Sequence, residues 1–148
     1  MNLPAHLDAL ARELTALISL LEQEAAVLAA NQADALPPLV TRREAANRHL
    51  ASLWQALTSG LGLSSTSGLS TLREHCLEQA PEDWRQVEES ARHAERMNRL
   101  NSRLIDEQLR RTQAAVQVLR SAAGGRMLYG ADGRMSEFLN PNRSIDSA

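Results

Sequence analysis

A chain of 148 residues is long enough for one domain with a substantial hydrophobic core and too short for two independent cores. Its formal net charge of −2 gives the chain as a whole no electrostatic attraction to nucleic acid or to anionic lipid. Hydrophobic residues make up 43% of the sequence, but aromatic residues are limited to two Trp, one Tyr and one Phe, and the Leu- and Ala-rich remainder favours helices over strands.

The first predicted helix covers residues 3–31 and carries a leucine repeat with alternating steps of four and three. Such a repeat places one apolar stripe on one helix face, which is typical of a bundle or coiled coil. Glu24 occupies a slot of the stripe where an apolar residue is expected. The repeat comprises Leu3, Leu7, Leu10, Leu14, Leu17, Leu21 and Leu28.

The second predicted helix covers residues 36–59. Pro37 and Pro38 fit its first turn, where missing N–H groups cost little, and Gly60 and Gly62 end it. Its repeat of steps of three and four includes Arg43. Because the connection to the first helix is short, we expect an antiparallel hairpin, and the acidic first helix should pair modestly with the basic second one.

A polar connection at residues 63–68 precedes a short predicted helix at 69–79 and a long one at 81–123. Pro81 opens the long helix, whose seam is polar in its middle at Asn98, Asn101 and Gln108. Residues 124–148 contain four glycines and no helical period, so we expect a flexible tail. The sequence thus predicts an all-α protein: an antiparallel helical bundle or coiled coil at residues 1–123, with two N-terminal helices packed on one long C-terminal helix.

The residues that usually carry chemistry are sparse or badly spaced. Cys76 is the only cysteine, which excludes an internal disulfide and favours a reduced, cytoplasmic setting. No Glu-x-x-His pair of a di-metal bundle is present, and Cys76 and its neighbour His75 point in different directions on a helix. Arginines recur along the long helix, but glutamates interleave with them as on a solvated face. We expect no catalytic site, cofactor, metal or nucleic-acid binding.

The same sequence lacks the signals of membrane targeting. Its first ten residues have neither the basic segment nor the apolar run of a signal peptide. No stretch reaches the roughly 18 uncharged apolar residues of a membrane span. We therefore predict a protein that is not inserted into a membrane.

The polar slots in the two seams have more than one interpretation. Buried polar groups at Glu24, Asn98, Asn101 and Gln108 would fix the register of the helices at a cost in stability. The slots could also face solvent where one helix extends beyond its neighbours. In a third interpretation, they line a groove whose polar groups bind a partner helix. Periodicity alone does not decide between these interpretations.

Four segments, in chain order, resemble the FlgN family of flagellar export chaperones. They are LISLLEQEAAVLAANQADAL (17–36), LVTRREAANRHLASL (39–53), NRLNSRLIDEQL (98–109) and LYGADG (128–133). The third is similar to the family's Asn-x-x-Asn-Gly-x-Leu-Ile pattern, with Ser102 in place of the usual Gly. The fourth is similar to the family's Tyr-Gly-x-x-Gly element.

The resemblance implies a cytoplasmic chaperone that binds C-terminal helical segments of the hook–filament junction proteins FlgK and FlgL, prevents their premature assembly and delivers them to the export gate. It makes Tyr129 a candidate gate contact, and it implies substrate contacts at Asn98, Asn101, Leu104, Ile105 and Gln108. Apolar anchors for an amphipathic substrate helix would be Leu104, Ile105, Leu109 and Leu119. The alternative is a structural helical adaptor or coiled-coil oligomerisation protein, and a homo-oligomer is compatible with either function.

Overall fold

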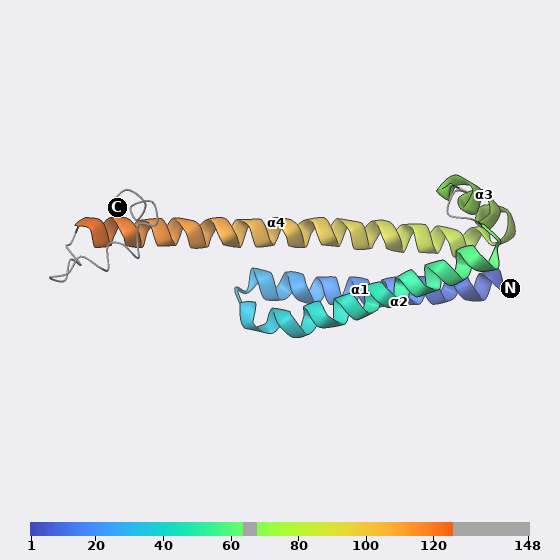
Figure 1. The fold of residues 1–148 in the computed structure, drawn as a ribbon, viewed down its shortest axis with the longest axis horizontal. Coiled ribbons are helices and arrows are strands. Elements are labelled where there is room, and N and C mark those ends of the chain that lie inside the picture. The colour runs from blue at the N-terminus through green and yellow to red at the C-terminus, as the bar shows by residue number, and fades with distance from the viewer. Residues whose placement is uncertain (64–67, 126–148) are drawn as a thin grey trace, which may run out of the picture. The chain divides into compact units, whose positions relative to one another are not determined.

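The computed structural model describes residues 1–63 and 68–125, and all regular elements in these stretches are helical (Figure 1). They are α1 (Leu3–Ala29), the 3-10 turn η1 (Ala33–Ala35), α2 (Leu36–Gly60), α3 (Leu69–Gln79) and α4 (Pro81–Gly125). The predicted all-α class is confirmed. The expected tail beyond Gly125, with Tyr129, and most of the polar connection lie outside the described residues.

Helix α1 begins and ends at local backbone signals. The side chain of Asn2 accepts a hydrogen bond from the N–H of Ala5 at 3.3 Å and so caps the first turn. At the other end Asn31 adopts a left-handed conformation with φ 56°. Its own N–H and the following one donate to the carbonyls of Leu28 and Val27, which is the Schellman arrangement. Asparagine tolerates this backbone better than most residues, so the helix ends just before it.

The end of α2 repeats this geometry with glycine. Gly62 has φ 66°, and its N–H donates to the carbonyl of Ser59 while the N–H of Leu63 donates to Thr58. Glycine has no Cβ to clash in this conformation, so Gly62 is the residue that stops the helix. Gly60 is still part of the last helical turn.

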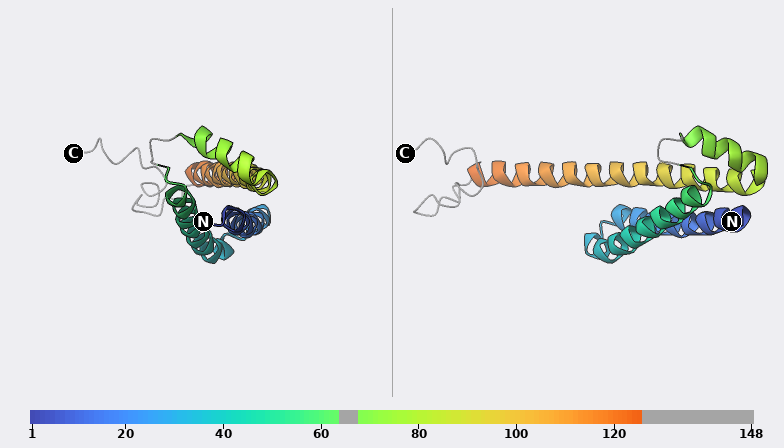
Figure 2. Two further views of the ribbon diagram at one scale, coloured as in Figure 1. Left: turned by 90° about the vertical axis from the view of Figure 1, so that its right-hand side faces the viewer. Right: turned by 45° about the vertical axis from the view of Figure 1, so that its right-hand side comes forward.

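Residues 1–105 form an antiparallel helical bundle. Helices α1 and α2 make a hairpin, and the first part of α4 lies alongside it (Figures 1 and 2). The core is in two parts that share the leucine stripe of α1. The part near the N-terminus contains Leu3, Leu7, Leu10, Ala11, Leu14, Leu57, Leu72, Cys76, Ala80, Trp84 and Val87. The second part contains Leu17, Ile18, Leu21, Ala46 and Ala94.

The short helix α3 belongs to this bundle, a point that the sequence left open. Its Leu72 and Cys76 are buried in the first core part together with Trp84 of α4. The guanidinium of Arg73 on α3 also bonds the carboxylate of Glu88 on α4 at 2.7 Å. Burial of a leucine-sized side chain stabilises a fold by about 1.5–3 kcal/mol, so the apolar contacts contribute most to holding α3 in place.

The chain separates into two compact units, residues 1–105 and 106–148. The first unit contains the bundle. In the second, the described residues 106–125 continue α4, and most of their side chains are exposed.

Candidate functional site: an open cleft in the bundle

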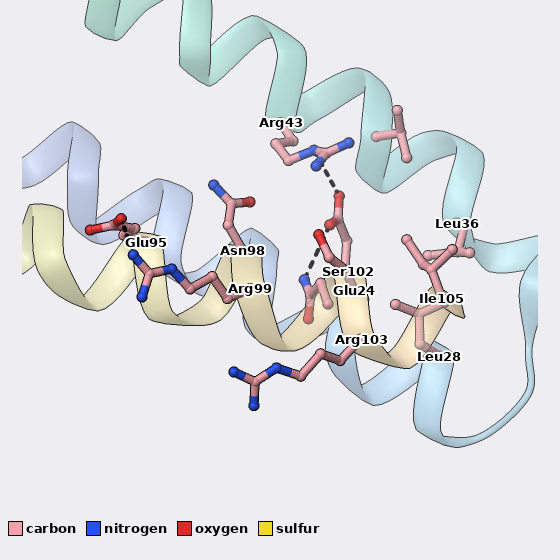
Figure 3. A pocket seen from close by; sticks show the side chains of 12 residues that line it. Glu24, Leu28, Leu36, Arg43, Glu95, Asn98, Arg99, Ser102, Arg103 and Ile105 are labelled. Atoms are coloured by element: carbon pink, nitrogen blue, oxygen red, sulfur yellow. Dashed lines mark hydrogen bonds and ion pairs between the residues drawn. The ribbon is translucent and has the colours of Figure 1, made fainter. Parts of the chain in front are cut away.

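A cleft of about 530 Å³ lies between three helices of the first unit (Figure 3). Its lining comes from the end of α1, the start of α2 and the Glu95–Ile105 segment of α4. Helix α1 contributes Glu24 and Leu28, α2 contributes Leu36, Val40 and Arg43, and α4 contributes Glu95, Asn98, Arg99, Asn101, Ser102, Arg103 and Ile105.

Three polar side chains, called here the polar cluster, join the three helices at this cleft: Glu24, Arg43 and Asn101. Arg43 Nε lies 3.2 Å from Glu24 Oε1. The Nδ2 group of Asn101 donates to Glu24 Oε2 at 3.3 Å and to the backbone oxygen of Leu21 at 2.9 Å. Glu24 is only 3% exposed and Asn101 only 4%. Both contacts with the Glu24 carboxylate are drawn in Figure 3.

The polar cluster specifies how the helices are aligned. A buried carboxylate loses its hydration and is tolerated only when it is paired. Although Arg43 Nε is close to Glu24 Oε1, neither atom makes a well-aligned hydrogen bond, so this contact is chiefly Coulombic. A slip of α4 by one residue would move Asn101 about 1.5 Å along the axis and about 100° around it, away from its acceptors. For Glu24 and Asn101 the structure therefore supports the register interpretation.

One end of the cleft is apolar. Leu28, Leu36 and Ile105 lie together there, each from a different helix (Figure 3). Leu28 is buried, Leu36 is half-buried, and Ile105 is 52% exposed. Ile105 is a large apolar side chain that is about half exposed to solvent beside a concave surface, so it is suited to contact with an apolar group of a partner.

The rest of the rim is polar and slightly cationic. Arg99 pairs with Glu95 at 2.5 Å, whereas Arg103 has no ion pair with any other residue in the described stretches. Three arginines and two glutamates line the cleft, an excess of one positive charge. Asn98 and Ser102 are exposed on the same face and supply amide and hydroxyl groups. The cleft can therefore accept a segment with one apolar side and one polar or acidic side.

The sequence-predicted contact residues fall into separate groups. Asn98, Asn101 and Ile105 line the cleft. Leu104, which precedes Ile105 in the sequence, is half-buried and does not line the cleft. Asn98 and Asn101 occupy successive seam slots but differ in environment, since Asn101 is buried by its bonds to α1 and Asn98 faces solvent.

Gln108, Leu109 and Leu119 belong to the second unit, on the continuation of α4. Leu109 is 55% exposed and Leu119 is 65% exposed, so this part of the helix presents apolar side chains to solvent. Tyr129 lies outside the described residues. The interpretation in which polar seam positions face solvent does not apply to Asn101, which is buried. The exposure of Leu109 and Leu119 shows that α4 presents part of its apolar face to solvent in the second unit.

The contact residues predicted from the sequence lie on α4, apart from Tyr129, and none of them comes from α2. Leu36, Val40 and Arg43 of that helix form one side of the cleft. A signal for this existed: Arg43 occupies a seam slot of the second helix, as Glu24 does in the first. Opposite charges in the seams of adjacent helices predict that the two residues meet, and the structure shows that they do.

Across 1–63 and 68–125, no three or more His, Cys, Asp or Glu side chains gather in a way that could hold a metal ion. No helix in these stretches combines the length and the apolar character that crossing a bilayer requires. The single thiol, Cys76, is buried in the core, and burial raises its pKa above the ordinary value for a cysteine.

The fold and the cleft define an antiparallel helical bundle with an open, amphipathic surface. The family described as FlgN protein matches residues 1–137. The chain therefore belongs to the FlgN family, whose members are flagellar export chaperones. No curated protein and no solved structure matches the chain in the corresponding searches.

Proposed function

We propose that this chain is a cytoplasmic chaperone for the hook–filament junction proteins FlgK and FlgL. It binds their C-terminal helical segments, prevents their premature assembly and delivers them to the flagellar export gate. Membership of the FlgN family supports the chaperone role. The observation that carries the binding mode is Ile105, a large apolar residue left 52% exposed at the apolar end of an open cleft.

In this proposal a substrate helix lays its apolar face against Leu36 and Ile105 at the apolar end of the cleft and against Val40 in its lining. Covering the exposed part of these side chains supplies the hydrophobic share of the affinity. Asn98 and Ser102, which already face solvent, bond to polar groups on the incoming helix. Asn101 contributes indirectly, because its bonds to α1 hold this stretch of α4 in position.

The substrate contact continues along α4 in this proposal. Leu104 directly precedes Ile105, and Gln108, Leu109 and Leu119 follow it on α4. The exposed Leu109 and Leu119 offer further apolar anchors. Tyr129 is the proposed contact with the export gate, on the basis of the Tyr-Gly-x-x-Gly resemblance. Release follows from competition at the gate, since a helix docked on an open surface can leave without an enclosing lid having to open.

The test uses the full chain and a peptide that spans the C-terminal helix of a hook–filament junction protein from the same bacterium, with affinity measured by isothermal titration calorimetry. Ile105→Asp should weaken binding at least about tenfold, because it places a charge where an apolar group must be desolvated. Leu100→Asp is the matched control: Leu100 is an exposed apolar residue of α4 that does not line the cleft.

Three outcomes count against the proposal. Lack of any complex at micromolar concentration would favour the structural adaptor over the chaperone for junction proteins. Equal binding by the Ile105→Asp variant and the unmodified chain, with helicity retained, would place the substrate elsewhere. Equal weakening by Leu100→Asp and Ile105→Asp would mean that α4 contributes general hydrophobicity rather than a cleft.

A further inference from the structure

An apolar stripe runs along α4 within the second unit. It consists of Leu109, Thr112, Val116 and Leu119, at successive steps of three, four and three, and it is called here the α4 stripe. Its three large apolar members are exposed, Leu109 by 55%, Val116 by 37% and Leu119 by 65%. This spacing is that of the a and d positions of a heptad repeat, the positions that face a partner helix in a coiled coil.

Two opposite charges flank the same side of the α4 stripe. Asp106 and Arg120 are 14 residues apart, which is two heptads, and each directly follows a d position. Within the described stretches neither side chain forms an ion pair, although other charged residues of α4 are paired, such as Arg111 with Glu107 at 2.5 Å. The stripe therefore has a negative group near its start and a positive group near its end.

We propose that the α4 stripe pairs with the same stripe of a second copy of this chain, in an antiparallel two-stranded coiled coil. When two such helices run in opposite directions, Leu109 faces Leu119 of the second copy and Thr112 faces Val116. The same register sets Asp106 beside Arg120 of the second copy, and two-fold symmetry repeats every one of these contacts. Two ion pairs thus flank four layers, two of Leu109 with Leu119 and two of Thr112 with Val116.

Charge selects the antiparallel direction. In a parallel pair the flanking contacts are between e and g positions, which sets Arg120 beside Ala115 and Gln113 beside Gln108 of the second copy. Among residues 106–125 that arrangement makes neither of the two ion pairs. A second copy of the chain is the occupant favoured by these observations because the charge pattern of the stripe is complementary to itself.

The expected dimer is weak and depends on concentration. The stripe covers two heptads, so the buried area falls at the low end for specific protein interfaces. The helix is already formed within the chain, however, so pairing does not bear the cost of helix nucleation. This inference goes beyond the proposed function and does not depend on it. Because Leu109 and Leu119 also belong to the proposed substrate contact, one copy can use them for only one partner at a time.

Sedimentation equilibrium of the full chain at low salt over a wide concentration range tests the charge arrangement. Asp106→Arg and Arg120→Asp should each weaken dimerisation about tenfold, since each replaces two attractive contacts by two repulsive ones. The double variant with both substitutions should restore the original affinity, because the charges are merely exchanged. Arg110→Asp is the control: it changes the net charge as Arg120→Asp does, at an exposed position away from the stripe.

Chemical cross-linking tests the register. The antiparallel pairing brings Ala115 close to Ala115 of the second copy, whereas Ala114 points away from the interface. A short bis-maleimide should therefore link the Ala115→Cys variant into a dimer and leave the Ala114→Cys variant largely unlinked. The native Cys76 is buried and does not compete for the reagent.

A monomer at every concentration overturns the proposal and leaves the stripe to an export substrate or to residues 126–148 of the same chain. Equal linking of the two cysteine variants, or a double charge variant no better than the single ones, overturns the register. None of these measurements includes a junction protein, so failure here is separate from failure of the chaperone assignment.

Discussion

Replacement of Arg43 by Met should destabilise the bundle, although Arg43 lies at the edge of a cleft and is partly exposed. Glu24 is 3% exposed, and Arg43 provides the positive charge 3.2 Å from its carboxylate. Removal of one partner of a fully buried ion pair costs about 3–5 kcal/mol. The side chain of Arg43 is 32% exposed, so water already screens part of this attraction, and we expect a loss of about 2 kcal/mol.

Substitution of the other partner of this ion pair, Glu24, should have a smaller effect on stability. Glu24→Leu restores an apolar residue to the leucine stripe of α1, and Arg43 can turn its guanidinium toward water. Asn101 loses one acceptor but keeps the backbone oxygen of Leu21 at 2.9 Å. We expect a loss below about 1 kcal/mol, and the double variant Glu24→Leu/Arg43→Met should recover most of the stability lost by Arg43→Met alone, as buried pairs replaced by apolar residues often do.

Urea unfolding followed by circular dichroism gives the free energies for the four members of this double-mutant cycle. A loss of less than about 0.5 kcal/mol for Arg43→Met would show that the ion pair is not what makes a buried Glu24 tolerable. Equal losses for the two single variants, with a double variant equal to their sum, would refute the coupling itself. Either result would remove the basis for assigning the polar cluster a role in helix alignment.

Further predictions concern the ends and the interior of the bundle. Asn31→Gly should be neutral or slightly stabilising and Asn31→Val destabilising by about 1–2 kcal/mol in thermal unfolding, because φ 56° suits glycine and strains a β-branched residue. The Arg73 guanidinium holds the pKa of Glu88 below its ordinary value. That bond therefore stabilises the fold above the ordinary glutamate pKa and is lost as pH falls through the lowered one, so Arg73→Gln should reduce stability at neutral pH and not in acid. Cys76 should react with a thiol reagent far more slowly in the native protein than in guanidinium chloride, since it is buried and its pKa is raised.

Local signals in the sequence determine where the helices lie. Asn31 and Gly62 adopt left-handed backbone conformations that stop a helix, and Pro81 starts one where no N–H partner is needed. These effects act within a few residues, so they can be recognised without knowledge of the fold. The leucine repeat of α1 likewise indicates a buried face before any partner is known, and the all-α class follows from it.

The environment of each seam position was decided only by tertiary structure. Periodicity treats Asn98 and Asn101 as equivalent, yet only Asn101 meets the end of α1, where Leu21 and Glu24 offer acceptors. The reason is that two positions three residues apart point about 60° away from each other around a helix, so one can face a neighbouring helix while the other faces solvent. The lining of the cleft by Leu36 and Val40 and the docking of α3 were likewise decided by the tertiary structure. Both depend on contacts between residues distant in sequence, which no local pattern specifies. The bundle class could therefore be predicted from the sequence, whereas the lining of the cleft could not.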